Sequence, residues 1–81
     1  MCLAIPVRID SMDTDTQATA SVGGIQRQID ISLVDDLAVG DYVILHVGFA
    51  LSKLDEEEAQ STLALMSKAG TLEEALDEVR G

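Results

Sequence analysis

The sequence predicts a mainly β protein with C-terminal helices: a small β-barrel followed by one or two helices. Three observations support this fold class. Apolar and polar residues alternate over much of the first part of the chain, as is typical of strands. Glycines and short polar segments separate these stretches, as in hairpins. After residue 54 the apolar residues recur every three or four positions, which indicates amphipathic helices.

The size and charge of the chain exclude several classes of function. Its 81 residues are enough for one small domain. It carries 5 basic and 15 acidic residues, a net charge of −10, which argues against binding to nucleic acid or to anionic membranes. Hydrophobic residues make up 47% of the chain and indicate a folded core. With one Tyr and one Phe, that core must be aliphatic.

The single cysteine and the N-terminal segment predict a cytoplasmic protein. Cys2 has no partner for an internal disulfide, and a small domain without disulfides fits a reducing compartment. The apolar stretch at the N-terminus is short, contains Pro6 and lacks a preceding basic region. It therefore has the features of neither a signal peptide nor a membrane span.

Residues 1–54 are predicted to form the β-barrel. Alternating apolar residues predict a first strand, which must lie at an edge or begin at Pro6, because proline cannot donate to a ladder. A polar loop is expected at 10–16. The pair Gly23-Gly24 can supply the positive φ angles of a tight hairpin between the next two strands.

The rest of the barrel region predicts one further strand. Residues 42–47 form an apolar run that should be a buried strand ending at Gly48. The segment before it, residues 32–39, could contain one helical turn. That turn would carry Leu33, Val34 and Leu37.

Residues 55–81 are predicted to form a helical segment. Asp55 with Glu58 and Thr71 with Glu74 have the spacing of capping boxes, and Gly70 is a stop signal between them. Two apolar stripes follow the helical period: Ala59, Leu63 and Met66, then Leu72, Ala75, Leu76 and Val79. The second stripe is more typical of packing within the chain than of docking.

Cys2 is the first candidate for chemistry. Removal of Met1 is expected because the next residue is small, so that the mature chain would begin with Cys2. Its thiol and α-amine then lie on adjacent carbons, with ordinary pKa values of about 8.5 and about 7.7–8.0. The nearby ammonium favours the thiolate, the form that binds soft metals. The alternative is an incidental cysteine at a chain end.

His46 is the second candidate. Side chains alternate along the predicted strand 42–47. One face carries Tyr42, Ile44 and His46, and the other carries Val43, Leu45 and Val47. A lone histidine in an apolar strand is more often structural than a ligand. One Cys and one His also fall short of the four ligands of a structural zinc site, so metal handling would require ligands from a partner.

Three segments together carry a family signature. They are residues 1–9 (MCLAIPVRI), residues 39–50 (VGDYVILHVGFA) and residues 54–59 (LDEEEA). Their residues and order resemble the HypC/HybG/HupF family of NiFe-hydrogenase maturation chaperones. The similarity runs from Met1 to about Met66.

The resemblance implies an OB-like barrel with a C-terminal helix and a chaperone rather than an enzyme. Family members assemble an Fe(CN)2CO unit with the HypD iron–sulfur scaffold protein and convey it to the hydrogenase large-subunit precursor. Cys2 and His46 match the residues implicated in holding this iron, for which a thiolate is a suitable soft ligand. Leu3, Ile5 and Pro6 would then dock Cys2 beside a cysteine of the partner.

Two other functions are compatible with the residues. The chain could be an enzyme with Cys2 as nucleophile, although its small size and the lack of Asn, Trp or a second histidine argue against this. It could also be a peptide-binding adaptor in which Cys2 is idle. Substitution of Cys2 distinguishes both from an iron carrier.

Overall fold

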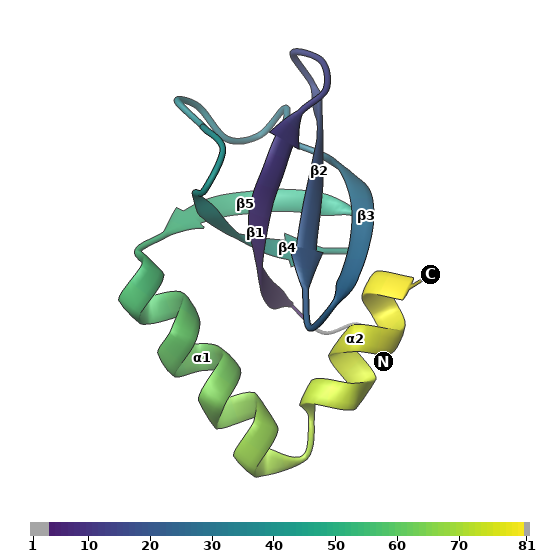
Figure 1. Cartoon of the computed structure of the whole chain (residues 1–81), viewed down its shortest axis with the longest axis vertical. Helices are drawn as coiled ribbons and strands as arrows, with labels where there is room; N and C mark the ends of the chain where they lie inside the picture. Colours follow the sequence, from purple (N-terminus) through teal and green to yellow (C-terminus); the bar gives the residue numbers. More distant parts are fainter. Residues whose placement is uncertain (1–3, 81) are drawn as a thin grey trace.

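The structure is a computed structural model that describes residues 4–80. Its elements, in chain order, are β1 (Ile5–Met12), β2 (Gln17–Val22), β3 (Ile25–Asp30), β4 (Tyr42–His46), β5 (Phe49–Leu54), α1 (Glu56–Ala69) and α2 (Leu72–Arg80). The strands close into a barrel in the order β1-β2-β3-β5-β4, and the helices lie together at one end of it (Figure 1). This confirms the predicted fold, an OB-like barrel followed by helices.

The first three strands form an antiparallel meander, as their alternation predicts. β1 begins at Ile5, and Pro6 pairs only with β4, ahead of the first β1–β2 pair at Arg8. The missing N–H of proline therefore interrupts no ladder to β2. Gly23 and Gly24 join β2 to β3 with φ angles of 55° and 81°, so the predicted tight turn is confirmed.

Two of the predicted loop features are wrong. The loop at 10–16 is shorter than predicted, because β1 continues to Met12. Met12 pairs with Ala18, beyond a bulge that lies between Ile9 and Ser11. The helical turn predicted within 32–39 is absent from the described structure, which has turns and bends there. Asp36 in this segment has a φ of 55°, outside the right-handed helical region.

The fifth strand and the turn that precedes it were not predicted from the sequence. β4 ends at His46, one residue earlier than expected, because Val47 and Gly48 form the two-residue turn to β5. β5 then pairs along β4 with a bulge between Ile44 and Leu45. A parallel pairing of β5 with β3 closes the barrel.

The C-terminal segment forms two helices, as predicted. α1 ends at Gly70, which has the left-handed φ of 78° expected of a helix-stopping glycine. Neither predicted capping box forms within the described residues. The Asp55 side chain makes no capping hydrogen bond, and the Thr71 hydroxyl donates instead to the carbonyl of Met66 at 3.3 Å.

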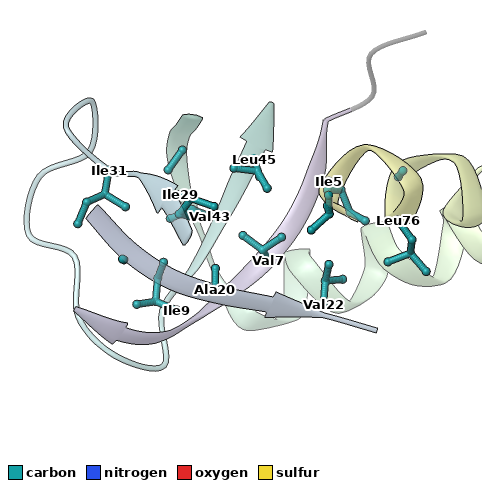
Figure 2. Close-up of a cluster of buried hydrophobic side chains, with 14 residues drawn as sticks. Ile5, Val7, Ile9, Ala20, Val22, Ile29, Ile31, Val43, Leu45 and Leu76 are labelled. Atoms are coloured by element: carbon teal, nitrogen blue, oxygen red, sulfur yellow. The ribbon is translucent and has the colours of Figure 1, made fainter. Parts of the chain in front are cut away.

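The core is aliphatic and extends from the inside of the barrel to α2. Figure 2 shows Ile9, Ile29 and Ile31 at one end and Ile5 and Leu76 at the other. α2 buries its predicted stripe, with Ala75, Leu76 and Val79 in the core and Leu72 half-buried against it. α1 is more exposed, burying Ala59 and partly burying Leu63 and Met66.

Candidate functional site

The pairing of β1 with β4 brings the start of the chain close to His46. Ile5 lies opposite Leu45, and the two strands run antiparallel. Ala4, which is exposed, precedes Ile5, and His46 follows Leu45. The sequence alone could not establish this proximity, because residues 4 and 46 are joined only through the strand pairing.

His46 lies on the outer face of β4, as predicted. Tyr42, Ile44 and His46 are half-buried on this face, whereas Val43 and Leu45 are buried in the core. The prediction was wrong for Val47, the third residue of the expected inner set, because it lies in the turn and is exposed.

The imidazole of His46 has one buried nitrogen without a partner. Its Nδ1 is shielded from solvent and makes no hydrogen bond within residues 4–80. A buried polar atom without a partner is uncommon in folded proteins and calls for an explanation. A structural histidine would use this nitrogen to hold the fold together. Here Nδ1 makes no such bond, so this nitrogen does not tie β4 to the rest of residues 4–80.

The predicted partner-binding residues divide into two pairs. Ile5 is 1% exposed and Pro6 is also fully buried, so neither side chain offers a surface to a partner in the folded chain. Their observed role is to fix the first strand: Ile5 packs in the core, and Pro6 lies on the outer face near α1. Cys2 and Leu3 lie outside the described residues, and their roles stay predictions.

α1 covers the outer face of β1 and β4 beyond the candidate site. Gln60 Nε2 donates to the hydroxyl of Tyr42 at 3.1 Å, which ties the helix to β4. A hollow of about 300 Å³ lies between helix and barrel. It is lined by Pro6, Arg8, Ser21, Val22, Gly23, Tyr42, Gln60 and Leu63.

The sequence analysis missed an exposed apolar surface beside His46. Val47, Phe49 and Leu51 are 61%, 45% and 47% exposed. Val47 also has a φ of 52°, a left-handed conformation that costs a non-glycine residue about 1–2 kcal/mol. The apolar run through residue 47 was interpreted as buried strand, and only the turn geometry shows that its end is exposed.

Of the three carboxylates with a lowered pKa, Asp10 and Asp13 lie away from His46, whereas Asp30 lies on β3 opposite Phe49. Asp13, just beyond the far end of β1, accepts hydrogen bonds from Thr19 Oγ1 at 2.7 Å and Ser11 Oγ at 2.9 Å. These bonds, with a weaker one from Gln28, lower the pKa of Asp13. They link three neighbouring strands, which is a structural role.

Neither a metal cluster nor a membrane span is found in the described part of the chain. Residues 4–80 contain no group of three His, Cys, Asp or Glu side chains placed to hold a metal ion. Over the same residues, no helix is both long and apolar enough to cross a membrane. An iron site would therefore need Cys2, His46 and ligands from elsewhere.

The fold and site define a class: a small β-barrel with C-terminal helices, in which the first strand pairs with the strand that ends at His46. A model of the HupF/HypC family matches residues 1–66. The chain belongs to the HupF/HypC family.

Three relatives illustrate this membership. The chain is 57% identical over 81 residues to the hydrogenase maturation factor HypC of Azotobacter chroococcum mcd 1, covering 100% of this chain and 96% of that protein. It is 52% identical over 66 residues to HypC of Rhizobium leguminosarum bv. viciae, covering 82% and 88%. HypC of Cupriavidus necator is 46% identical over 68 residues, covering 84% and 76%.

These comparisons confirm the family predicted from the three sequence segments. They also confirm that the chain belongs with maturation chaperones and not with enzymes. The family model ends within α1, so α2 lies outside the matched region.

Proposed function

We propose that this protein is a cytoplasmic hydrogenase maturation factor that carries an Fe(CN)2CO unit on Cys2. The unit would be received from a HypD-type iron–sulfur scaffold protein and delivered to the NiFe-hydrogenase large-subunit precursor. The observation that carries this proposal is the β1–β4 register, in which Ile5, three residues after Cys2, lies opposite Leu45, the neighbour of His46. Relatives named hydrogenase maturation factor HypC support the same role.

Chain length permits Cys2 and His46 to act together. Cys2 precedes Ala4 by two residues, so its Cα lies within about 7.6 Å of the Ala4 Cα. Ala4 is in turn the neighbour of Ile5, which lies opposite Leu45, the residue before His46. A thiolate from Cys2 and the imidazole of His46 can therefore approach one iron atom, with the remaining ligands supplied by the cargo and the partner.

Transfer requires only an exchange of ligands. The Cys2 thiol loses its proton as its sulfur binds the iron, and the iron–sulfur bond to the donor protein's cysteine breaks. The displaced thiolate takes up a proton, so no atom changes oxidation state. Iron with cyanide and carbon monoxide is soft, which favours thiolate on both sides of the exchange. The imidazole of His46 would help to hold the iron while Cys2 binds it.

Substitution of Cys2 tests this function. Cys2→Ala should abolish hydrogenase maturation and remove the cyanide and carbonyl infrared bands from protein purified anaerobically with its scaffold partner. The urea midpoint should hardly change, because a residue near the chain end contributes little to the core. Cys2→Ser is the matched control for size and should fail in the same way, because a hydroxyl is a poor ligand for soft iron.

The opposite results identify the alternatives. A Cys2→Ala protein that still matures hydrogenase would exclude the thiolate carrier and favour an adaptor whose cysteine is idle. A Cys2→Ala protein that unfolds would show that Cys2 is a packing residue.

A further inference from the structure

An open groove of about 490 Å³ lies between two loops of the barrel. One loop joins β1 to β2, and the other is the segment 31–41 between β3 and β4. Both loops lie at the end of the barrel opposite the helices (Figure 1). Four apolar side chains form the floor of the groove: Ile31 is buried, Val34 and Leu37 are half-buried, and Met12 is 41% exposed. The groove therefore has an apolar surface that the chain itself covers only in part.

The rim of the groove is acidic. The same two loops contribute four exposed aspartates to its lining: Asp13, Asp15, Asp35 and Asp36. Among the described residues, no lysine, arginine or histidine lines the groove. Asp13 accepts hydrogen bonds from neighbouring side chains, whereas the carboxylates of the other three form neither a hydrogen bond nor an ion pair within residues 4–80. Negative charge and apolar surface therefore lie side by side in the groove.

Lys53 approaches one of the loops without pairing with the rim carboxylates. Its Nζ donates to the backbone carbonyl of Asp36 at 3.0 Å and lies 3.3 Å from the carboxylate of Asp41. Asp41 does not line the groove. The ion pair of Lys53 therefore leaves the rim aspartates without a basic partner in the described part of the chain.

We propose that this groove binds a segment of a partner protein in which lysine or arginine residues stand beside aliphatic ones. The aliphatic side chains cover the floor, and the basic groups face the rim, because an interface buries apolar surface at its centre and matches charge at its edge. A second copy of this chain is a poor occupant, since each copy carries a net charge of −10.

The groove is distant from the candidate iron site. Figure 2 shows Ile31, which lines the groove, at the opposite end of the core from Ile5. Ile5 lies opposite Leu45, the neighbour of His46. A partner segment in the groove therefore does not cover that site, and the inference does not depend on the proposed iron carrier.

Two labelled peptides test the proposal on the full chain. One alternates lysine with leucine, and the other alternates lysine with serine, so the two differ in apolar side chains and not in charge. Fluorescence anisotropy should show that the lysine–leucine peptide binds more tightly by roughly tenfold or more, because its leucines bury apolar surface in the groove. Added salt should weaken the binding of both peptides.

Paired charge variants locate the binding on the chain. Asp35→Asn with Asp36→Asn removes two charges from the rim, and asparagine tolerates the φ of 55° at residue 36. Affinity for the lysine–leucine peptide should fall by roughly threefold to tenfold. Glu57→Gln with Glu58→Gln is the matched control, because it removes the same charge from exposed positions at the start of α1. This control should bind the peptide like the wild type.

A second pair of variants tests the floor. Met12→Ala removes an apolar side chain of the groove, so affinity for the lysine–leucine peptide should fall by roughly threefold or more, with no change for the lysine–serine peptide. Leu51→Ala is the matched control, since Leu51 is 47% exposed on β5 and does not line the groove. Urea unfolding verifies that each variant is folded.

Three results would overturn the proposal. The first is an absence of binding by the lysine–leucine peptide. The second is equal affinity of the wild type for both peptides, or equal losses in the rim and α1 charge variants, since the charge of the whole chain would then account for binding. The third is a dimer in sedimentation that dissociates in the Asp35→Asn, Asp36→Asn protein, which would assign the groove to a second copy. The iron carrier function is tested separately by substitution of Cys2.

Discussion

At the scale of single residues, His46 is where a structural and a functional role differ most. Its ring is half-buried on the outer face of β4, and its Nδ1 makes no hydrogen bond within residues 4–80. If His46 stabilised the fold through a hydrogen bond, truncating it would lower the protein's free energy of unfolding by about 1–3 kcal/mol. His46 has no such bond at Nδ1 to lose within residues 4–80, so its truncation should cost little stability through hydrogen bonding.

We therefore expect His46→Ala to weaken iron retention more than stability. The free energy of unfolding should fall by less than about 1 kcal/mol, because no buried hydrogen bond at Nδ1 is broken. Iron-dependent complex formation, measured on the same sample as urea unfolding, should be impaired. If a strongly destabilised His46→Ala protein recovered partner binding on cooling, the histidine would be structural after all.

Tyr42→Phe provides the control on the same face of β4. It removes the hydroxyl that accepts the 3.1 Å hydrogen bond from Gln60. A hydrogen bond of this kind contributes about 0.5–1.5 kcal/mol, so stability should fall modestly. Iron retention should be unaffected, since Tyr42 lies at the opposite end of β4 from His46.

At the scale of elements, α2 depends on the barrel for its stability. Nine residues are too few for a stable isolated helix. α2 is held by its buried stripe and by Arg27, whose Nη1 donates to the carbonyl of Val79 at 3.3 Å. Leu76 is the largest side chain that it buries, and it lies close to Gly23 of the β2–β3 turn. α2 therefore closes the end of the barrel from which the chain begins.

Leu76→Ala should destabilise the protein strongly. Truncation of a buried leucine costs about 2–5 kcal/mol, a large part of the roughly 4–12 kcal/mol expected for a domain of this size. Leu65→Ala is the matched control on α1, because Leu65 is 67% exposed, and it should change the unfolding free energy by only about 0.5 kcal/mol. Urea unfolding measures both. Equal small losses would contradict the tight docking of α2.

At the scale of the whole molecule, hydrogen-bonded carboxylates make stability depend on pH. Side-chain hydrogen bonds from Ser21 and Gln26 lower the pKa of Asp10, and those from Ser32 lower the pKa of Asp30. Side-chain hydrogen bonds lower the pKa of Asp13 in the same way. A lowered pKa means that the folded state binds a proton less readily than the unfolded state. The stabilisation that these carboxylates contribute is complete above pH 3.8, which is their ordinary pKa. It is lost as the pH falls through the lower pKa that they have in the folded state.

The urea midpoint is therefore expected to fall as pH drops below about 4. Asp13→Asn should make this acid dependence shallower, because the side chain no longer titrates. The control is Asp15→Asn, which removes the same charge from the same loop. Asp15 makes no side-chain hydrogen bond within the described residues. A wild-type midpoint that is constant from pH 5 to pH 2 would contradict this account.

The sequence by itself determined the elements whose patterns are local. Alternation predicted β1 to β3 and an apolar run predicted β4. The pair Gly23-Gly24 predicted the first tight turn, and helical spacing predicted α1 and α2 with the correct buried stripes. The three family segments identified the family. These features depend on neighbouring residues, so a single chain segment contains the information needed to predict them.

Only the tertiary structure decided the features that depend on distant residues. β5 was missed because a bulge interrupts its alternation and its larger apolar residues face outward, while small Ala50 occupies the core. Ile5 and Pro6 were predicted to meet a partner, and they are buried because the barrel and its helices enclose the first strand. The approach of the start of β1 to the end of β4 follows from a register between residues 34 to 40 positions apart in sequence, which no local pattern specifies.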